Sequence, residues 1–147
     1  MQRVGVMALV SDPLVHDVIG CAIDVHRALG PGLLESTYGR CFQAELAAKR
    51  IAFRTEVPVT IQYRSLRLDG GYRIDLLVEG RLIVEIKAVE VLQPIHTAQV
   101  LTYLRLSGVR QGLIINFNCP RLKDGLKIEP PGVVFFVMAL QALNSSL

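Results

Sequence analysis

Two short apolar runs that flank the turn Glu79-Gly80 dominate the middle of this 147-residue sequence. The first run, Tyr72–Val78, and the second, Leu82–Lys87, are rich in Ile, Val and Leu, as expected of strands inside a sheet. The second run nevertheless ends in the charged residues Glu85 and Lys87. Charges at the end of a predicted central strand are costly unless they are paired or bind a metal ion. We therefore expect a hairpin with a site at its open end.

The length of the turn decides whether Asp75 in the first strand and Glu85 in the second form one site. A two-residue loop pairs Val78 with Arg81 and sets Asp75 opposite Val84, so that the two carboxylates lie on opposite faces. A three-residue loop, or a bulge, sets Asp75 opposite Glu85 on the same face. The sequence leaves both registers open, and only the second supports a shared site.

The residue types at this position indicate metal chemistry if the second register holds. Two carboxylates within a few ångströms favour a hard divalent cation such as Mg²⁺, because this ion prefers oxygen ligands. Lys87 shares the face of Glu85, since side chains alternate along a strand. Its amine can orient or deprotonate a water molecule, or stabilise negative charge on a phosphoryl group. An ordinary surface ion pair among Asp75, Glu85 and Lys87 is the competing interpretation.

The rest of the sequence predicts helices and further strands around this hairpin. Helices are expected from Pro13 to the turn Gly30-Pro31-Gly32, at about Leu33–Arg50 and at Pro94–Ser107, where Gly108 is the stop signal. Strands are expected where Val57, Val59, Ile61 and Tyr63 alternate along one buried face, at Leu66–Leu68, Gln111–Phe117 and Val133–Leu140, with a loop at Asn118–Gly132. This order predicts one α/β domain in which helices cover both faces of a mixed sheet.

Composition narrows the class of protein. The length fits a single domain, and 51% hydrophobic with 20% charged residues excludes a disordered or collagen-like chain. The net charge of +3 permits a nucleic-acid partner, although the basic residues form no single run. Three separated cysteines predict free thiols. No apolar run approaches the ~20 residues that span a bilayer, so we expect a cytoplasmic protein with no membrane partner.

Polar side chains on two of the predicted helices are candidates for the same site. Glu35 lies at the edge of the apolar stripe of the second helix, which contains Leu34, Tyr38, Cys41, Phe42 and Leu46. On the third helix, His96, Gln99 and Tyr103 line one face, because they are spaced i, i+3 and i+7. A first-turn acid favoured by the helix dipole explains Glu35 equally well, and a solvated polar face explains the others.

These blocks together resemble a known family. Gly32, Glu35 and Tyr38 form the signature G-x-x-E-x-x-Y, which is followed in order by Y-R-I-D-L-L-V (72–78), I-V-E-I-K-A-V (83–89), I-H-T-A-Q-V-L-T-Y-L (95–104) and G-L-I-I-N-F (112–117). Over roughly residues 14 to 118 the chain is similar to the GxxExxY protein family, a branch of the PD-(D/E)XK nuclease superfamily. The resemblance implies a restriction-endonuclease-like α/β core over about residues 14–140 of a single domain, 1–147.

The resemblance also implies a function. It indicates a nuclease that uses Mg²⁺, or Mn²⁺, to hydrolyse phosphodiester bonds of nucleic acid, DNA in the first place. By position, Asp75 matches the first acidic ligand of the metal, and Glu85 and Lys87 match the E-x-K motif, although Ile74 replaces the usual proline. The implied metal ligands are Asp75, Glu85, the backbone carbonyl of Ile86, and Glu35. The implied catalytic set is Lys87, Glu35, Asp75, Glu85, and the Q-x-x-x-Y pair Gln99 and Tyr103.

Other hypotheses accompany this one. The same fold could serve as a non-catalytic module that binds nucleic acid or a protein. A Cys–His enzyme, using Cys41 with His26 or Cys119 with His96, lacks any local signature. Small nucleases of this fold often dimerise, and the apolar run Val133–Leu140 offers an edge for pairing two copies into a homodimer.

Overall fold

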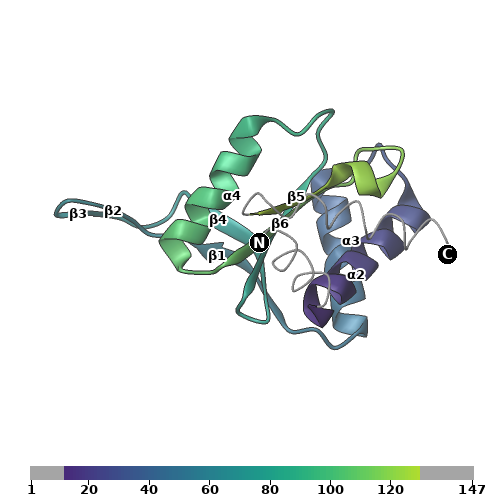
Figure 1. Ribbon diagram of the computed structural model, residues 1–147, viewed down its shortest axis with the longest axis horizontal. Helices are drawn as coiled ribbons and strands as arrows, with labels where there is room; N and C mark the ends of the chain where they lie inside the picture. The colour runs from purple at the N-terminus through teal and green to yellow at the C-terminus, as the bar shows by residue number, and fades with distance from the viewer. Residues whose placement is uncertain (1–11, 130–147) are drawn as a thin grey trace, which may run out of the picture.

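A computed structural model describes residues 12–129 of the chain, which form an α/β structure (Figure 1). The two apolar runs of the hairpin are both strands, and helices precede and follow them. In chain order the elements are α2 (Pro13–Leu29), α3 (Glu35–Ala48), β1 (Phe53–Pro58), β2 (Ile61–Tyr63), β3 (Leu66–Leu68), β4 (Arg73–Val78), β5 (Leu82–Lys87), α4 (Pro94–Ser107), β6 (Gln111–Asn116), the 3-10 turn η1 (Leu122–Gly125) and β7 (Leu126–Glu129).

The main sheet has five strands in the order β1-β4-β5-β6-β7. The pair β5–β6 is parallel and the other pairs are antiparallel, so the sheet is mixed as expected. Helix α4 supplies the crossover that parallel neighbours require. Strand β5, which ends in Glu85 and Lys87, occupies the centre of the sheet. The charges at its end therefore lie beside the core rather than on an exposed edge.

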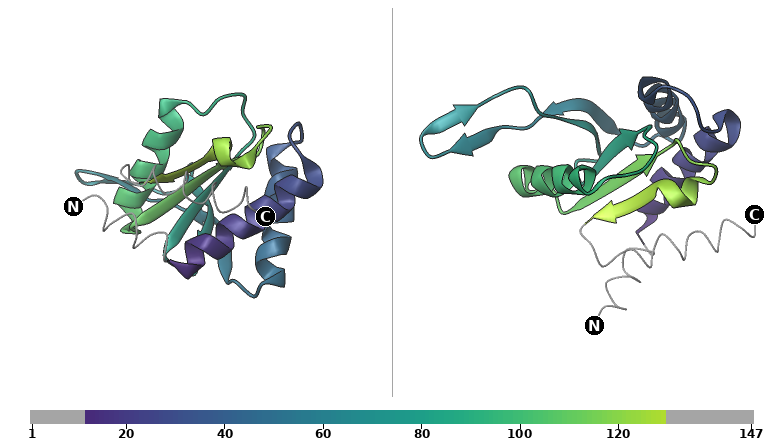
Figure 2. Two further views of the ribbon diagram at one scale, coloured as in Figure 1. Left: turned by 45° about the vertical axis from the view of Figure 1, so that its right-hand side comes forward. Right: turned by 90° about the horizontal axis from the view of Figure 1, so that it is seen from above.

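Helices cover both faces of the sheet, as predicted. On one face α2 and α3 pack their apolar side chains against Val84, Ile86, Leu113 and Ile115. On the other face α4 packs Val100 and Leu104 against Ile83 and Ile114. Figure 2 shows α4 on the opposite side of the sheet from α2 and α3. Two separate cores thus hold the sheet between them, and the strand ends lie at the boundary between the two layers.

Local signals set the ends of α2 and α4. The side chain of Asp12 accepts a hydrogen bond from the backbone N–H of Leu14 at 2.9 Å and caps α2, and Pro13 occupies its first position. Helix α4 begins at Pro94 and ends before Gly108, which has φ 75° and so adopts a conformation that favours glycine. These bounds agree with the predicted ones, because the capping residues lie next to the helices that they end.

The single strand predicted through Val57 and Tyr63 is wrong. The structure divides it into β1 and β2, and β2 pairs only with β3 in a separate two-stranded sheet. Pro58 ends β1, since proline has no N–H to donate to a ladder. Ile61 is half-buried and Tyr63 is 60% exposed, so the alternating pattern beyond Val59 marks no buried face.

The loop predicted over residues 118–132 is also wrong within the described part of the chain. Residues 122–129 form η1 and β7, and β7 pairs with β6 through four residues on each strand, Leu126–Glu129 and Gly112–Ile115. Leu126 and Ile128 contribute to the core, but the alternation is too short to be distinguished from a loop in the sequence. The strand predicted at 133–140, and the dimer edge placed on it, lie outside the described residues.

Within residues 12–129 no helix combines the length and the apolar character that crossing a membrane requires.

Candidate active site

The β4–β5 hairpin has a three-residue loop, Glu79 to Arg81, which fixes the register. Val78 pairs with Leu82 and Leu76 with Val84, so continuing this register places Asp75 opposite Glu85. Both Glu79 (φ 52°) and Gly80 (φ 67°) adopt the left-handed conformation, which glycine accommodates without strain. The two-residue loop, which would set Asp75 opposite Val84, is therefore excluded, and Asp75 and Glu85 lie next to one another where the ladder ends.

The carboxylates of Asp75 and Glu85 lie where the backbone ladder between β4 and β5 ends. The N–H of Asp75 donates to Glu85 Oε1 at 3.3 Å, and the N–H of Ile86 donates to Asp75 Oδ2 at 2.9 Å. Beyond the pair Leu76–Val84, side-chain oxygens thus accept hydrogen bonds from the two strands. The two acids are held by the backbone itself, which gives each of them a defined position.

Glu85 is the most perturbed acid of this cluster. Its side chain is almost completely buried, with 2% of the residue exposed. Burial, the negative charge of Asp75 and a hydrogen bond with Asp75 together raise the pKa of Glu85 to about 9, and the charge of Lys87 opposes this only in part. Glu85 therefore holds a proton at neutral pH unless a cation is bound nearby. A strongly shifted carboxyl beside a second acid and a lysine is typical of functional sites.

A chain of side chains connects Lys87 to α4. Lys87 Nζ donates to Gln99 Oε1 at 3.3 Å, and Gln99 Nε2 donates to the hydroxyl oxygen of Tyr103 at 3.1 Å. Tyr103 is buried, and its pKa is raised by burial first and by the charge of Glu85 next. Helix α4 approaches the sheet closely at Gly112, where a Cβ atom would lie 2.6 Å from Val100 Cγ1. This close packing holds α4 against the sheet, and the hydrogen bond from Lys87 places Gln99, with Tyr103, at the end of β5.

Glu35 reaches the same region from the other layer. It is the first residue of α3 and lines a pocket of about 290 Å³ together with Asp75 and Ile86. Burial raises the pKa of Glu35; Lys87 lowers it and Asp75 raises it, which places all three charges within electrostatic reach. Glu35 is thus a partner of the cluster on β4 and β5, rather than only a first-turn acid on an isolated helix surface.

The turn before α3 is anchored by Tyr38, a residue whose positioning role the sequence did not reveal. Its buried hydroxyl donates to the carbonyl of Gly30 at 2.5 Å and accepts from the N–H of Leu33 at 3.1 Å. The ring stacks on Phe117, with centroids 4.7 Å apart and planes 5° apart. Gly32 has φ 99° and donates its N–H to Asn118 Oδ1 at 3.1 Å. The hydrogen bonds of Gly32 and Tyr38 therefore fix the turn before α3, and with it the position of Glu35 at the start of the helix.

We expect the variant Tyr38→Phe to lose stability through this anchor. Removing the hydroxyl leaves the carbonyl of Gly30 and the N–H of Leu33 without their partner, which costs about 1–3 kcal/mol in free energy of unfolding. Urea denaturation of the two proteins measures the difference. Tyr63→Phe is the matched control, because that ring is 60% exposed, and its expected change is within about 0.5 kcal/mol. Equal losses in both variants would contradict the anchoring role.

Asn116 is a second positioning residue that sequence reasoning missed. Its side-chain amide donates to the carbonyl of Val89 at 2.9 Å and accepts from the N–H of Val89 at 3.1 Å. Asn116 is buried at the end of β6, opposite Lys87 in the parallel pair. It therefore holds the segment that leaves β5 directly after Lys87. The sequence feature that could have indicated this role is an asparagine at the end of an apolar strand, because a buried amide needs hydrogen-bond partners.

The expected site residues meet at one end of the sheet but line two cavities. Lys87, Gln99 and Tyr103 line a groove of about 500 Å³ between α4 and the start of the β2–β3 hairpin. Glu35, Asp75 and Ile86 line the smaller pocket beside α3. Glu85 lines neither cavity and lies buried next to Asp75. His96 lines the larger groove, and its Nδ1 accepts the N–H of Gln93 at 2.9 Å as part of the α4 cap.

The residues present fit a divalent cation of the Mg²⁺ type. Across residues 12–129 no three His, Cys, Asp or Glu side chains are grouped so as to hold a metal by themselves. Mg²⁺ does not need such a cage, because it usually binds through one or two carboxylates, water and substrate phosphates. Asp75 and Glu85 supply two carboxyl groups in contact, and a cation bound there would take the place of the proton that Glu85 otherwise holds.

The Cys–His alternative has no geometric support. The Nε2 atom of His26 hydrogen-bonds the backbone carbonyl of Cys119 at 2.7 Å, and the thiol of Cys119 contacts the carbonyl of Asn116. Burial raises the pKa of the Cys119 thiol, which disfavours the reactive thiolate. All three cysteines are free.

The fold and the site together define a class of protein: a restriction-endonuclease-like α/β domain, in which an acid pair and a lysine lie at the end of the central strands of a mixed sheet. The comparison of the chain with known families agrees, because residues 12–128 match the PD-(D/E)XK nuclease superfamily. The chain belongs to this superfamily. No curated protein and no solved structure shows significant similarity to it.

Proposed function

We propose that the protein is a divalent-metal-dependent nuclease that hydrolyses phosphodiester bonds in DNA, and that it belongs to the GxxExxY branch of its superfamily. One observation carries the proposal: the half-buried Asp75 and the buried Glu85 are in contact, next to a lysine whose amine is held by Gln99. The signature residues Gly32, Glu35 and Tyr38 support the branch, because they shape the turn that presents Glu35 to this cluster. A cytoplasmic location and a homodimer stay predictions.

Asp75, Glu85 and the backbone carbonyl of Ile86 would hold the metal ion, and Glu35 would hold a second one directly or through water. When bound, such an ion polarises a phosphate oxygen and lowers the pKa of a bound water molecule. Glu85 has to give up its proton to act as a ligand, because only the ionised carboxylate binds well. Metal binding by this chain is therefore expected to release a proton and to strengthen as the pH rises.

Lys87 is assigned the role of positioning the attacking water and stabilising the negative charge that develops on the phosphate. Its amine is partly exposed in the larger groove, and Gln99 restrains it through the 3.3 Å hydrogen bond. Gln99 and Tyr103 are positioning residues, since the described contacts connect them to Lys87 and to one another rather than to the acids. A fixed amine costs no reorganisation when the charge forms, which is the condition for efficient electrostatic catalysis.

The test is a cleavage assay on single-stranded, duplex and branched DNA and on RNA. We expect DNA to be cut in Mg²⁺ or Mn²⁺ and cleavage to stop when the metal is removed with EDTA, because the acids without a cation offer a phosphate no positive charge to bind. If the protein binds DNA but does not cut it in either metal, the alternative holds, and the fold serves as a non-catalytic binding module. Cleavage that persists in EDTA would contradict the metal-dependent mechanism.

A further inference from the structure

A two-stranded hairpin projects from the body of the protein and takes no part in the main sheet. We call residues 60–69, which contain β2 and β3, the arm. Figures 1 and 2 show the arm extending away from the sheet on the side of α4, far from α2 and α3. A strand rises about 3.3 Å per residue, so the five residues from Thr60 to Arg64 reach roughly 15 Å. An isolated hairpin of this kind is marginally stable in water unless something supports it.

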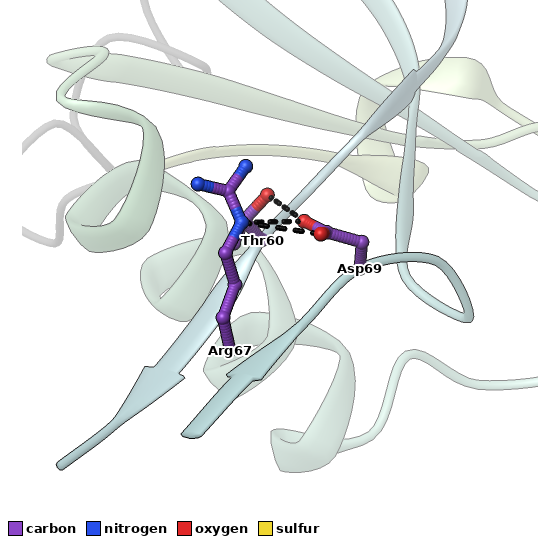
Figure 3. A network of polar contacts seen from close by, with 3 residues as sticks. All are labelled: Thr60, Arg67 and Asp69. Atoms are coloured by element: carbon purple, nitrogen blue, oxygen red, sulfur yellow. Dashed lines mark hydrogen bonds and ion pairs between the residues drawn. The ribbon is translucent and has the colours of Figure 1, made fainter. Parts of the chain in front are cut away.

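Polar contacts at its base hold the arm in shape. Thr60 Oγ1 donates to Asp69 Oδ1 at 2.8 Å, and Arg67 Nε donates to both carboxylate oxygens of Asp69 at 3.1 and 3.2 Å (Figure 3). Near the tip, Gln62 Nε2 donates to the carbonyl of Arg64 at 2.8 Å. The bond between Thr60 and Asp69 joins the two sides of the arm beyond their three-pair ladder, while the contacts of Arg67 and Gln62 each lie within one side of it.

The side chains of the arm are suited to a negatively charged partner. The arm contains Arg64 and Arg67 against the single acid Asp69, which gives a net charge of +1, and Arg73 follows it at the start of β4. Asp69 is occupied by Arg67, and no carboxylate among residues 12–129 pairs with Arg64, whose guanidinium lies 5.4 Å from the ring centroid of Tyr63. Tyr63 and Leu66 are 60% and 53% exposed, so the arm also presents uncovered apolar surface.

The arm is continuous with the proposed active site. Ile61 at the start of β2, and Tyr72 after the arm, line the larger groove together with Lys87 and Tyr103. A nucleic acid with one phosphate at Lys87 would therefore extend along the arm. At about 3.4 Å per nucleotide, the reach of the arm corresponds to roughly four or five base pairs.

We propose that the arm binds duplex DNA beside the cleaved phosphate by placing its two-stranded ribbon in the major groove. This inference rests on the proposed function, since it takes the phosphate at Lys87 as its reference point. The major groove of B-form DNA is about 12 Å wide and admits a two-stranded β-ribbon. The major groove of A-form RNA is too narrow and deep for side chains, so the arm distinguishes duplex DNA from duplex RNA.

The experiment measures binding apart from cleavage, by fluorescence anisotropy of a short labelled DNA duplex in EDTA. We expect Arg64→Ala to weaken binding about five- to tenfold, and to lower the slope of log affinity against log salt by about one. Arg64→Glu should weaken it further. Arg110→Ala is the matched control, because this exposed arginine precedes β6 at the end of the sheet far from Lys87. The DNA affinity of this variant should stay within about twofold of the wild type. Thermal melting checks that every variant is folded.

Several results would overturn the inference. One is that Arg64→Ala and Arg64→Glu bind duplex DNA as tightly as the wild type does. The others are that the wild type does not bind duplex DNA, or that it binds an RNA duplex of the same sequence with equal affinity. A change in sedimentation of the free variants at unchanged DNA affinity would show that the arm pairs two copies of the chain instead. If the wild type binds DNA through Arg64 but never cleaves it in Mg²⁺, the nuclease proposal fails while the arm inference stands.

Discussion

Lys87→Ala is expected to lower the rate of DNA cleavage in Mg²⁺ by about 10²–10³-fold, the usual loss when a fixed group that stabilises transition-state charge is removed. The amine of Lys87 is held at 3.3 Å by Gln99 in the larger groove, so no other described lysine can replace it there. The variant should fold normally, because Lys87 is only half-buried at the end of β5. Initial rates on the preferred DNA substrate measure the effect.

Lys49→Ala is the matched control for this prediction. This variant removes the same charge as Lys87→Ala. Lys49, however, directly follows α3 on the surface, where its amine lies 3.5 Å from a carboxylate oxygen of Asp24. Its cleavage rate should stay within about twofold of the wild type, as for most surface substitutions. If Lys87→Ala also retains the full rate, then Lys87 has no part in the chemistry. If both variants and the wild type cleave equally in EDTA, the activity belongs to a contaminant.

Glu85→Gln is expected to abolish cleavage while it stabilises the metal-free protein at alkaline pH. Folding raises the pKa of Glu85 from 4.5 to about 9, so between these values the folded state holds one proton more than the unfolded state. The free energy of unfolding therefore falls as the pH rises, by up to roughly 1.4 kcal/mol per pH unit. The stabilisation from protonated Glu85 is complete at pH values below the pKa of the unfolded state, and it is lost once the pH reaches the pKa of the folded state. Glutamine stays neutral over this pH range, so the free energy of unfolding of the variant lacks this fall with rising pH.

Thermal melting in EDTA at pH 5.5 and pH 8.5 compares the two proteins. The melting temperature of the wild type should fall more steeply between these values than that of Glu85→Gln, and Glu90→Gln, an exposed acid, should behave as the wild type. With Mn²⁺ present, the wild type should gain more stability at pH 8.5 than at pH 5.5, because the metal competes with the proton. A wild-type melting temperature with the same pH dependence as the variant would show that Glu85 is already ionised in the metal-free fold.

Local patterns in the sequence were sufficient for most of the helices and strands. Asp12, Pro13 and Gly30 bound α2, and Pro94 and Gly108 bound α4, because caps act on residues that are neighbours in the chain. The pattern failed at Val59 and Tyr63, where the alternation continues although β2 leaves the main sheet. Alternation reports which side chains share a face, but it does not report whether another layer covers that face.

The candidate site was predictable as a set of residues but not as an arrangement. Glu35, Asp75, Glu85, Lys87, Gln99 and Tyr103 were identified by type, order and resemblance. Their division between two cavities, and the complete burial of Glu85, depend on how α3 and α4 pack on opposite faces of the sheet. Tyr38 and Asn116 were missed as positioning residues, because their hydrogen bonds join segments that only the fold brings together.

The sequence by itself determined the residue types, their order along the chain and the helix ends, since these follow from interactions between near neighbours. Only the tertiary structure decided that the loop from Glu79 to Arg81 has three residues, which brings Asp75 and Glu85 next to one another at the end of the ladder. The dipeptide Glu-Gly permits both loops, and the choice between them depends on long-range packing of β4 and β5 against both helical layers. That choice decides whether Asp75 and Glu85 meet, and with it whether the site forms.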